Sequence, residues 1–565
     1  MWETLPKNGS PALRPQLFPT AFMQSISGLN QTQAPWTCWI SGSHNMKNIS
    51  EIRKIDGIWT LLVDGKPFTM LCGEVHNSSA SDAGYMEEQV WPFLKGLHIN
   101  SLLVPVYWEM IEAKEGDFDF NVLDAIIEQA EREGVKLGIL WLGLWKNGIS
   151  SYAPEWVKKD PGRFFRSEDR YNRPMDVISA FCKAAVEADA KAFGRLMEHI
   201  GEKNKETQNV ILVQVENEVG LLGSDRDYSP EANALFAKEI PGEVSGMYER
   251  SGSWEQAFGE EAAEVFMEYA YARAVGWIAK AGKEAYPLPM CVNAWIEKFP
   301  WRPGGYPSGG PIARFLPLWK RFAPDIDAVC PDVYTSDFKG ICREYKTAGN
   351  PLLIPEHRRD IRNISHLFYA AGACQALCFS PFGIEDFLMP PETRTGIGNP
   401  EVMKILNIDK SAWECEKTGV FLGLAYQLLA SSMDVIYRYQ KMGKVHGFLR
   451  ENEHDKGTVI HLSSCDVQIG YIDQKPDTPK SAGLIIESGD REFYAAGVNF
   501  RYSLLPPKNE MREAGILEYS EGQFRDGEFR RGRILNGDER YCMLMLEKPE
   551  LQRVKWYFYQ EDIER

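Results

Sequence analysis

The stretch Val210-Ile211-Leu212-Val213-Gln214-Val215-Glu216-Asn217-Glu218-Val219-Gly220 decides the fold. Five of its first six residues are apolar and mostly β-branched, which predicts a strand buried on both faces. The strand ends in Glu-Asn-Glu, and acids at the tip of a buried strand are costly unless solvent or a ligand reaches them. In a barrel of parallel strands, catalytic groups lie at this tip. The same tripeptide recurs at 451–453 inside a polar turn, so the preceding strand is the informative part.

The composition is that of an acidic globular chain. Its 565 residues predict two or three domains, and its formal net charge of −16 argues against nucleic acid or an anionic membrane as a partner. The 16 Trp suit a carbohydrate partner, because sugar C–H faces stack on aromatic rings. The 11 Cys form no CxxC pair, and Cys374 and Cys378 are expected to be core thiols. We find no apolar run of transmembrane length and no signal peptide, which favours a cytoplasmic setting.

The chain divides into four expected segments. Residues 1–45 lack periodicity and are expected to be a loose leader, and residues 46–400 alternate between strands and helices. The alternation contains eight short apolar runs that we predict to be strands, at 69–76, 99–108, 135–145, 210–218, 288–295, 326–334, 351–356 and 375–382. Eight such strands separated by helices predict an α/β fold, a TIM (β/α)8 barrel.

A different pattern follows the barrel. Residues 401–440 are expected to be a connecting helical segment, and residues 441–565 a smaller C-terminal β-sandwich domain. This domain is expected to pack on the barrel or to form a homo-oligomer contact. Its predicted strands are 457–463, 483–487, 492–498, 540–547 and 553–559.

Polar and aromatic residues gather at the predicted strand ends, where a barrel would bring them to one face. The candidate catalytic pair is Glu218 and Glu356, at the tips of the fourth and seventh strands, which lie across the barrel mouth from each other. The candidate substrate-binding residues are Glu74, His76, Trp108, Glu112, Trp145, Asn147, Asn217, Trp295 and Tyr334.

The chemistry that remains after other classes are excluded needs two carboxylates. The chain contains no HExxH, CxxC or clustered His set, so no metal is expected, and no phosphate-binding glycine motif follows a strand. We therefore expect no cofactor. Glycoside hydrolysis uses one carboxylic acid to protonate the leaving oxygen and a second carboxylate to attack the anomeric carbon or to activate water.

The motifs resemble those of glycoside hydrolase family 35, the β-galactosidases of clan A. The residues from Gln214 to Gly220 resemble the acid/base motif, and Gly73-Glu74-Val75-His76 resembles the first-strand motif. The run from Leu94 to Asn100, then Trp108 to Glu112 and Gly116 to Phe120, resembles the second-strand region. With its β-rich tail, the chain is similar to a bacterial subgroup of that family.

The resemblance implies a retaining, exo-acting hydrolase that removes terminal non-reducing β-D-galactosyl residues. Glu218 would be the acid/base and Glu356 the nucleophile; Asn217 would bind the sugar 2-hydroxyl, and Tyr334 would hold the nucleophile. Neighbouring donors, Tyr334 and also Arg358, would keep Glu356 ionised. Glu216, on the same face by strand alternation, is expected to be a buried structural partner.

The chain departs from the family pattern at several strand tips, so two alternatives stay open. Trp145-Lys146-Asn147-Gly148 stands where the family commonly has Ala-Glu-Trp, and Pro355-Glu356-His357-Arg358 replaces a Ser-Glu motif. One alternative is another clan A β-glycosidase, acting on arabinosides, fucosides or xylosides. The other is a catalytically inactive sugar-binding barrel.

Overall fold

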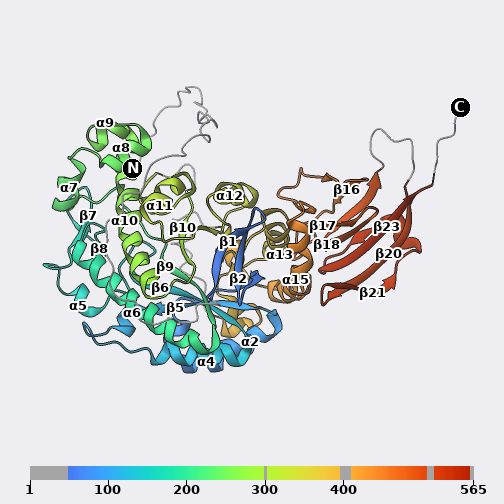
Figure 1. The fold of residues 1–565 in the computed structure, drawn as a ribbon, viewed down its shortest axis with the longest axis horizontal. Coiled ribbons are helices and arrows are strands. Elements are labelled where there is room, and N and C mark those ends of the chain that lie inside the picture. Colours follow the sequence, from blue (N-terminus) through green and yellow to red (C-terminus); the bar gives the residue numbers. More distant parts are fainter. Residues whose placement is uncertain (1–48, 298–301, 395–408, 506–513, 560–565) are drawn as a thin grey trace, which may run out of the picture. The chain divides into compact units, whose positions relative to one another are not determined.

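The computed structural model describes residues 49–297, 302–394, 409–505 and 514–559 (Figure 1). The expected leader at 1–45 and the expected boundary between residues 400 and 401 lie outside the described residues.

The central element is a ring of eight parallel strands. Going round the ring, the strands are β4 (Met70–Leu71), β13 (Cys378–Pro381), β12 (Leu353–His357), β11 (Ala328–Val333), β10 (Met290–Trp295), β9 (Val210–Asn217), β6 (Lys136–Lys146) and β5 (Ser101–Tyr107). A parallel bridge between Glu74 and Leu103, with Leu103 N–H donating to Gly73 O, joins the two end strands. The predicted TIM barrel is confirmed, and each predicted run overlaps one of these strands, with β6 and β12 each ending one residue later than predicted.

The barrel interior below the strand tips is filled with small and apolar side chains, which include Leu103, Leu212, Cys291 and Cys330. Because every residue of β9 is buried, its tip can be exposed only toward the barrel mouth. The mostly apolar run 210–215 therefore sets the position along the barrel axis at which Glu218 leaves the sheet.

Helices surround the strands, as Figure 1 shows. Those that follow or precede the barrel strands are α4 (Asn121–Glu133), α6 (Lys183–Thr207), α10 (Ala262–Ala285), α11 (Leu316–Phe322), α12 (Phe338–Tyr345) and α13 (Arg362–Tyr369). Gly134 ends α4 in the left-handed conformation, with φ 69°, as its sequence position predicts. The first crossover is a broken helix, α1 (Ala83–Tyr85), a π turn (Met86–Val90) and α2 (Trp91–Leu94), because Pro92 cannot donate to a regular helix.

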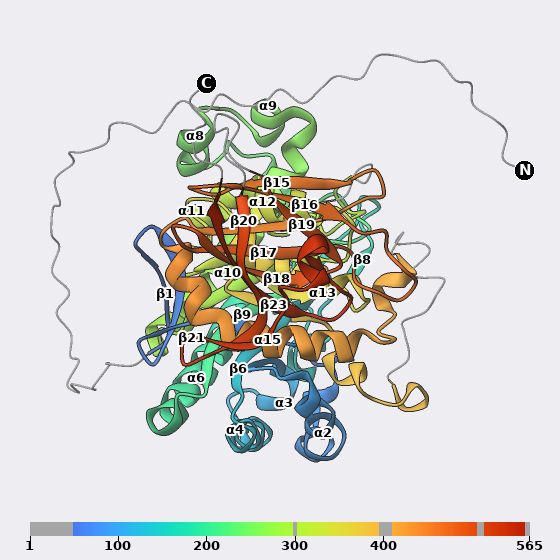
Figure 2. The ribbon, with the colours of Figure 1, turned by 90° about the vertical axis from the view of Figure 1, so that its right-hand side faces the viewer.

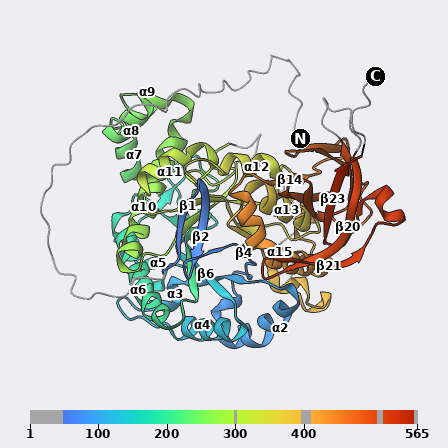
Figure 3. The same cartoon turned by 45° about the vertical axis from the view of Figure 1, so that its right-hand side comes forward.

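Between β9 and α10 the chain makes a helical excursion of three short helices, which Figure 3 shows grouped beside α10. They are α7 (Pro230–Phe236), α8 (Gly242–Tyr248) and α9 (Trp254–Phe258). A reciprocal capping box between Ser253 and Gln256 begins α9. An antiparallel sheet of β1 (Glu51–Ile55), β2 (Ile58–Val63) and β3 (Lys66–Phe68) precedes the barrel, and Asp64-Gly65 makes the predicted turn.

The C-terminal region consists of two antiparallel sheets (Figure 2). One has the order β14 (Val445–Leu449), β17 (Ala482–Gly489), β18 (Glu492–Val498), β23 (Glu550–Phe558), β20 (Ala514–Arg525) and β21 (Glu528–Ile534). The other has the order β15 (Gly457–His461), β16 (Asp466–Tyr471), β19 (Phe500–Leu505) and β22 (Leu544–Met545). Ile485, Phe493, Val467 and Phe500 share one apolar cluster between the sheets, as in a sandwich.

Two predictions for this region were wrong. The expected strand at 540–547 is mostly a 3-10 turn (Asp538–Cys542) followed by the short β22. The long hairpin of β20 and β21 was not predicted, because the charged residues of β21 hide its alternation and the exposed strand lies at a sheet edge.

Helix α15 (Thr418–Gln440) corrects the expectation that no apolar run reaches transmembrane length. Its 23 residues and mean hydropathy of 1.4 satisfy that criterion, and half of its most apolar window is buried inside the protein. Tyr426 donates a hydrogen bond to Cys72 O (2.6 Å), and Gln440 donates to Ala371 O (2.8 Å). The apolar residues of α15 thus pack on the barrel.

Candidate active site

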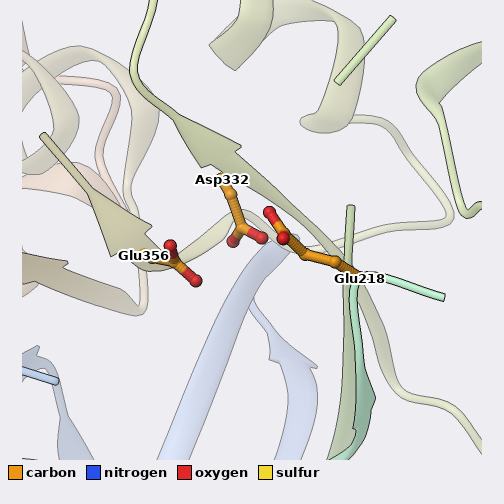
Figure 4. Close-up of side chains that lie close together, drawn as sticks. All are labelled: Glu218, Asp332 and Glu356. Carbon is orange, nitrogen blue, oxygen red and sulfur yellow. The ribbon is translucent and has the colours of Figure 1, made fainter. Parts of the chain in front are cut away.

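Three carboxylates meet at the barrel mouth (Figure 4). Glu218 follows β9, Asp332 lies in β11 and Glu356 lies in β12, and each offers an oxygen within 4.8 Å of the other two. In Figure 4, Asp332 lies between the two glutamates. Glu218 and Glu356 are each 7% exposed, so both sit at the limit of solvent access. The predicted catalytic pair is brought together, with a third acid added.

The backbone that presents Glu218 is strained. Glu216 and Glu218 both have positive φ, 62° and 45°, which costs a residue with a Cβ about 1–2 kcal/mol each. Asn293 in β10 stabilises this conformation by accepting a hydrogen bond from Glu218 N–H (2.9 Å). Such strain is typical of functional sites, where the surrounding structure holds a side chain in a required direction.

The same distortion reverses the expected direction of Glu216. Opposite this one residue, β6 has the four residues 142–145, so the register slips and simple alternation fails. Glu216 accepts hydrogen bonds from the backbone N–H groups of Leu144 (3.1 Å) and Trp145 (2.8 Å). Its side chain therefore lies behind the barrel wall, where Asp189 of α6 also accepts from Leu144 N–H (2.8 Å). It is a buried structural partner, but not on the face of Glu218.

One carboxyl oxygen of Glu356 accepts a hydrogen bond, and the other is buried without a donor among the described residues. Tyr334 O–H donates to Oε1 (2.6 Å), while Oε2 has no hydrogen-bond donor among the described residues. Arg358 does not contact Glu356; its guanidinium binds Asp360 (2.6 Å) and Tyr334 O (3.0 Å). The expectation that Arg358 helps to keep Glu356 ionised is wrong, because residue 358 points into an ion-pair network beside the site.

That network holds a segment from outside the barrel over the site. Asp409 accepts hydrogen bonds from Arg358 (3.2 Å) and Arg362 (3.0 Å). Its hydrogen bonds with Ser411 and then Arg358 lower the pKa of Asp409 to about 2 despite its partial burial. Four residues later, Trp413 stacks on Tyr334, with ring centroids 4.9 Å apart, and lies edge-on to Phe382. The connecting segment therefore contributes the aromatic side chain of Trp413 beside Tyr334, which binds Glu356.

Asn217 is held by a buried lysine. Lys146 Nζ donates to Asn217 Oδ1 (2.8 Å), so the amide Nδ2 points elsewhere, and Nδ2 has no acceptor in the described part of the chain. Because a lysine can only donate, the amide orientation is fixed chemically. An open N–H donor beside Glu218 suits a ligand hydroxyl.

Glu74 and His76 belong to the same end of the barrel. Glu74 is buried, and one of its oxygens has no donor among the described residues. His76 Nε2 lies 2.8 Å from Asp386 Oδ2, and its ring is edge-on to Phe382. Trp295 is half-buried at the tip of β10, two residues beyond Asn293 and thus on the same face by alternation.

The structure places three of the predicted sugar contacts, Trp108, Glu112 and Trp145, away from the carboxylates, whereas Asn147 N–H donates to Asn217 O (3.2 Å) beside Glu218. Trp108 donates to Glu112 (2.7 Å), and both are buried beside Trp141 and Trp156 in the layer outside the strands. Trp145 donates to Ile178 O and packs on Tyr271 of α10, because the β6 bulge turns it outward. Asn147 is exposed and begins a tight turn with Gly148, both with positive φ (51° and 69°).

Burial and mutual repulsion raise the pKa values of the acids in the cluster. Burial, then the charge of Glu356, raises the pKa of Glu218 to about 7, while Lys146 works in the opposite direction. Burial and the neighbouring Glu356 and Glu218 charges raise the pKa of Asp332 well above its usual range. Burial and Glu356 do the same for Glu74. These raised pKa values suit carboxyl groups that hold and transfer protons.

Sequence reasoning did not select four residues that shape this site, namely Asp332, Lys146, Asn293 and Trp413. Asp332 and Asn293 do end predicted strands, and their strand-tip positions were the available signal. Lys146 precedes an Asn-Gly pair, which is the strongest short turn signal. This pair indicates that the strand ends at Lys146. Nothing local in the sequence brings Trp413 to the barrel mouth.

Comparison with known proteins points to β-galactosidases. Residues 88–266 match the model of glycoside hydrolase family 42, described as beta-galactosidase, and residues 422–546 match a domain of unknown function. A beta-galactosidase from Xanthomonas manihotis is 28% identical over 182 residues, which are 31% of this chain and 28% of that protein. The match thus spans less than a third of the relative's length.

Two solved structures are similar at low identity. The beta-galactosidase from Bacillus circulans sp. alkalophilus has a TM-score of 0.44 and 14% identity, covering 65% of this chain and 57% of that one. The catalytic domain of beta-amylase from Paenibacillus polymyxa has a TM-score of 0.43 and 12% identity, covering 61% and 98%. The sequence matches support a β-galactosidase-like domain of clan A type, and the family that matches is 42 rather than 35.

Proposed function

We propose that this chain is a retaining, exo-acting glycoside hydrolase that removes terminal non-reducing β-D-galactosyl residues by double displacement. The observation that supports it is the pairing of Glu218 and Glu356 across the barrel mouth, with oxygens within 4.8 Å of each other. Retaining enzymes place the two carboxyl groups about 5–5.5 Å apart, whereas inverting enzymes need roughly 6.5–9.5 Å for a water molecule. Within clan A, the resemblance of the motif at 214–220 supports family 35 as the finer assignment.

In this mechanism Glu356 is the nucleophile. Tyr334 O–H fixes Oε1, and the open Oε2 attacks the anomeric carbon to give a glycosyl-enzyme. Glu218 donates its proton to the departing oxygen, then accepts a proton from the water that hydrolyses the intermediate. Asn217 Nδ2, oriented by Lys146, donates to the sugar 2-hydroxyl.

The raised pKa of Glu218 gives this mechanism a predicted pH profile. Because Glu218 must be protonated in the first step, kcat/KM should fall as pH rises through its pKa of about 7. The measurement is kcat/KM for a nitrophenyl β-galactoside between pH 5 and 9, a range about two units either side of that pKa. A profile flat to pH 9 would contradict the assignment of Glu218.

Azide rescue tests the nucleophile. Glu356→Ala should lose hydrolysis of nitrophenyl β-galactoside, and azide should restore turnover by giving the glycosyl azide of inverted configuration. Glu218→Ala should lose roughly 10²–10⁴-fold with a poor leaving group, and azide should give the azide of retained configuration. Glu112→Gln is a matched control, because this buried carboxylate lies outside the cluster and azide should not affect it. Rescue of neither glutamate variant would contradict the double displacement.

A panel of nitrophenyl arabinosides, fucosides and xylosides separates the proposal from other β-glycosidases. Faster turnover of any of these than of the galactoside would reassign the substrate and keep the mechanism. Sugar binding without turnover of any glycoside would favour the inactive barrel.

A further inference from the structure

Asp332 is a third carboxyl group that the two-carboxylate mechanism does not use. It is 2% exposed, and one of its carboxyl oxygens lies within 4.8 Å of a carboxyl oxygen of Glu218. Figure 4 shows the two groups facing each other. Two ionised carboxylates are both acceptors only, so a hydrogen bond between them requires a proton on one of them.

The other contacts of Asp332 show which oxygen can hold that proton. Asn293 Nδ2 donates to Oδ2 (2.7 Å), so Oδ2 acts as an acceptor. Oδ1 is buried and has no N–H or O–H donor among the described residues. A buried oxygen without a donor is costly as a carboxylate but satisfied as an O–H that donates to Glu218.

Asn293 also ties this arrangement to the backbone of the acid/base. Its Oδ1 accepts from Glu218 N–H (2.9 Å) while its Nδ2 donates to Asp332. One amide therefore contacts both the backbone of Glu218 and the carboxyl group of Asp332.

We propose that Asp332 stays protonated through the catalytic cycle and donates a hydrogen bond from Oδ1 to Glu218, which makes it a positioning residue for the acid/base. This rests on the proposed function. When Glu218 gives its proton to the departing oxygen, the Asp332 O–H stabilises the carboxylate that remains. When water attacks the glycosyl-enzyme, Glu218 takes a proton from the water, and the bond from Asp332 is retained. Glu218 thus regains the proton that it gave away, and Asp332 keeps its own throughout the cycle.

The surroundings favour a neutral Asp332. The ionisable groups that face the pair are Glu356 of β12, Glu74 beyond β4, Lys146 of β6 and Tyr334 beyond β11. The carboxyl groups of Glu218, Glu356 and Glu74 share one lysine, which leaves no cation to pair with a further charge on Asp332. Burial and these neighbours raise the pKa of Asp332 well above its usual range, in agreement with the geometry.

The decisive comparison is between Asp332→Asn and Asp332→Ala. Asparagine keeps both bonds, with its oxygen accepting from Asn293 and its amide donating to Glu218, so the fall of kcat/KM at high pH should stay within about half a pH unit of wild type. Alanine removes the donor to the Glu218 carboxylate, so that fall should move up by about one pH unit, and hydrolysis of the glycosyl-enzyme should slow on the order of tenfold.

Other outcomes overturn the proposal. A fall moved to lower pH in Asp332→Asn would mean that Asp332 is ionised in the wild type. Equal losses of activity in both variants with unmoved profiles would mean a purely structural role.

Infrared difference spectra keep the proposal testable if Asp332→Ala does not fold. At pH 8.5, wild type minus Asp332→Asn should show the carbonyl band of one protonated carboxyl group, and its absence would overturn the proposal. Glu216→Gln is the matched control, because Glu216 and Asp189 are buried together outside the site, both accepting from Leu144 N–H, and burial and Asp189 raise the pKa of Glu216 well above its usual range. It should remove a band without moving the pH profile. A wild type without hydrolytic activity would instead contradict the proposed function and leave the spectra to decide on Asp332.

Discussion

At the scale of single residues, the site depends on one buried cation among four acids. Lys146 is 7% exposed, and its side chain donates one hydrogen bond in the described part of the chain, to Asn217. Its charge lowers the pKa values of Glu74 and Glu218 against the effect of burial. Lys146 therefore connects the orientation of the Asn217 amide with the protonation of Glu218.

Lys146→Met should change both properties. Without the charge, the pKa of Glu218 rises further, so the fall of kcat/KM at high pH should move upward by about one unit. Asn217 loses its partner and can turn, so KM should rise as well. The measurement is the pH dependence of kcat and KM for the same nitrophenyl glycoside.

Lys158→Met is the control for this prediction, because Lys158 forms a partly exposed ion pair with Glu109 outside the cluster. It should leave the profile in place. A downward shift in Lys146→Met would show that Lys146 does not stabilise the ionised form of Glu218.

At the scale of elements, the sequence predicted strands well and their ends poorly. All eight barrel strands were predictable because runs such as 210–215 are apolar and bounded by polar tips. Trp145 was misplaced because a bulge in β6 changes its side-chain direction without altering the apolar pattern. The pairing of Glu218 with Glu356 was predictable from strand order, whereas the position of Trp413 depends on ion pairs between distant segments.

The β6 bulge depends on Gly143. A Cβ at this position would lie 2.5 Å from Asp189 Oδ2 and 2.7 Å from Glu216 Oε1, both of which are fixed by backbone hydrogen bonds. Gly143→Ala should therefore lower the free energy of unfolding by about 1–3 kcal/mol, the usual cost of overpacking a core. Chemical denaturation measures this loss.

Gly246→Ala is the matched control for Gly143→Ala. Its Cβ would meet nothing within 4 Å, and helix α8 should gain about 0.5–1 kcal/mol. Equal stability of the two variants would mean that the carboxyl pair can move away, and that the bulge does not set the position of Glu216.

At the scale of the whole molecule, the described residues from 49 onward form one compact unit, although barrel and sandwich have separate apolar clusters. Hydrogen bonds cross between the two regions, from Ser365 to Lys480 O (2.8 Å) and from Lys339 N–H to Glu451 (3.1 Å). The second Glu-Asn-Glu, at 451–453, thus has a structural contact, in agreement with its polar context.

Two glycines bring the barrel and the sandwich into backbone contact. A Cβ on Gly447 of β14 would lie 2.4 Å from Ala373 N, and one on Gly372 would lie 2.7 Å from Leu484 Cβ. Because the contact involves main-chain atoms, it cannot relax by turning a side chain. Barrel and sandwich should therefore unfold together in a single thermal transition.

Gly447→Val should separate the two transitions. Valine suits a strand, so local propensity favours the change, but its Cβ forces β14 away from Ala373 at a cost of about 1–3 kcal/mol. Calorimetry should then show two transitions where the wild type shows one. In the control Gly470→Val, the nearest atoms belong to the Arg501 side chain, which can move, so the single transition should remain. Two transitions in the wild type, or one in Gly447→Val, would show that this contact does not couple the barrel to the sandwich.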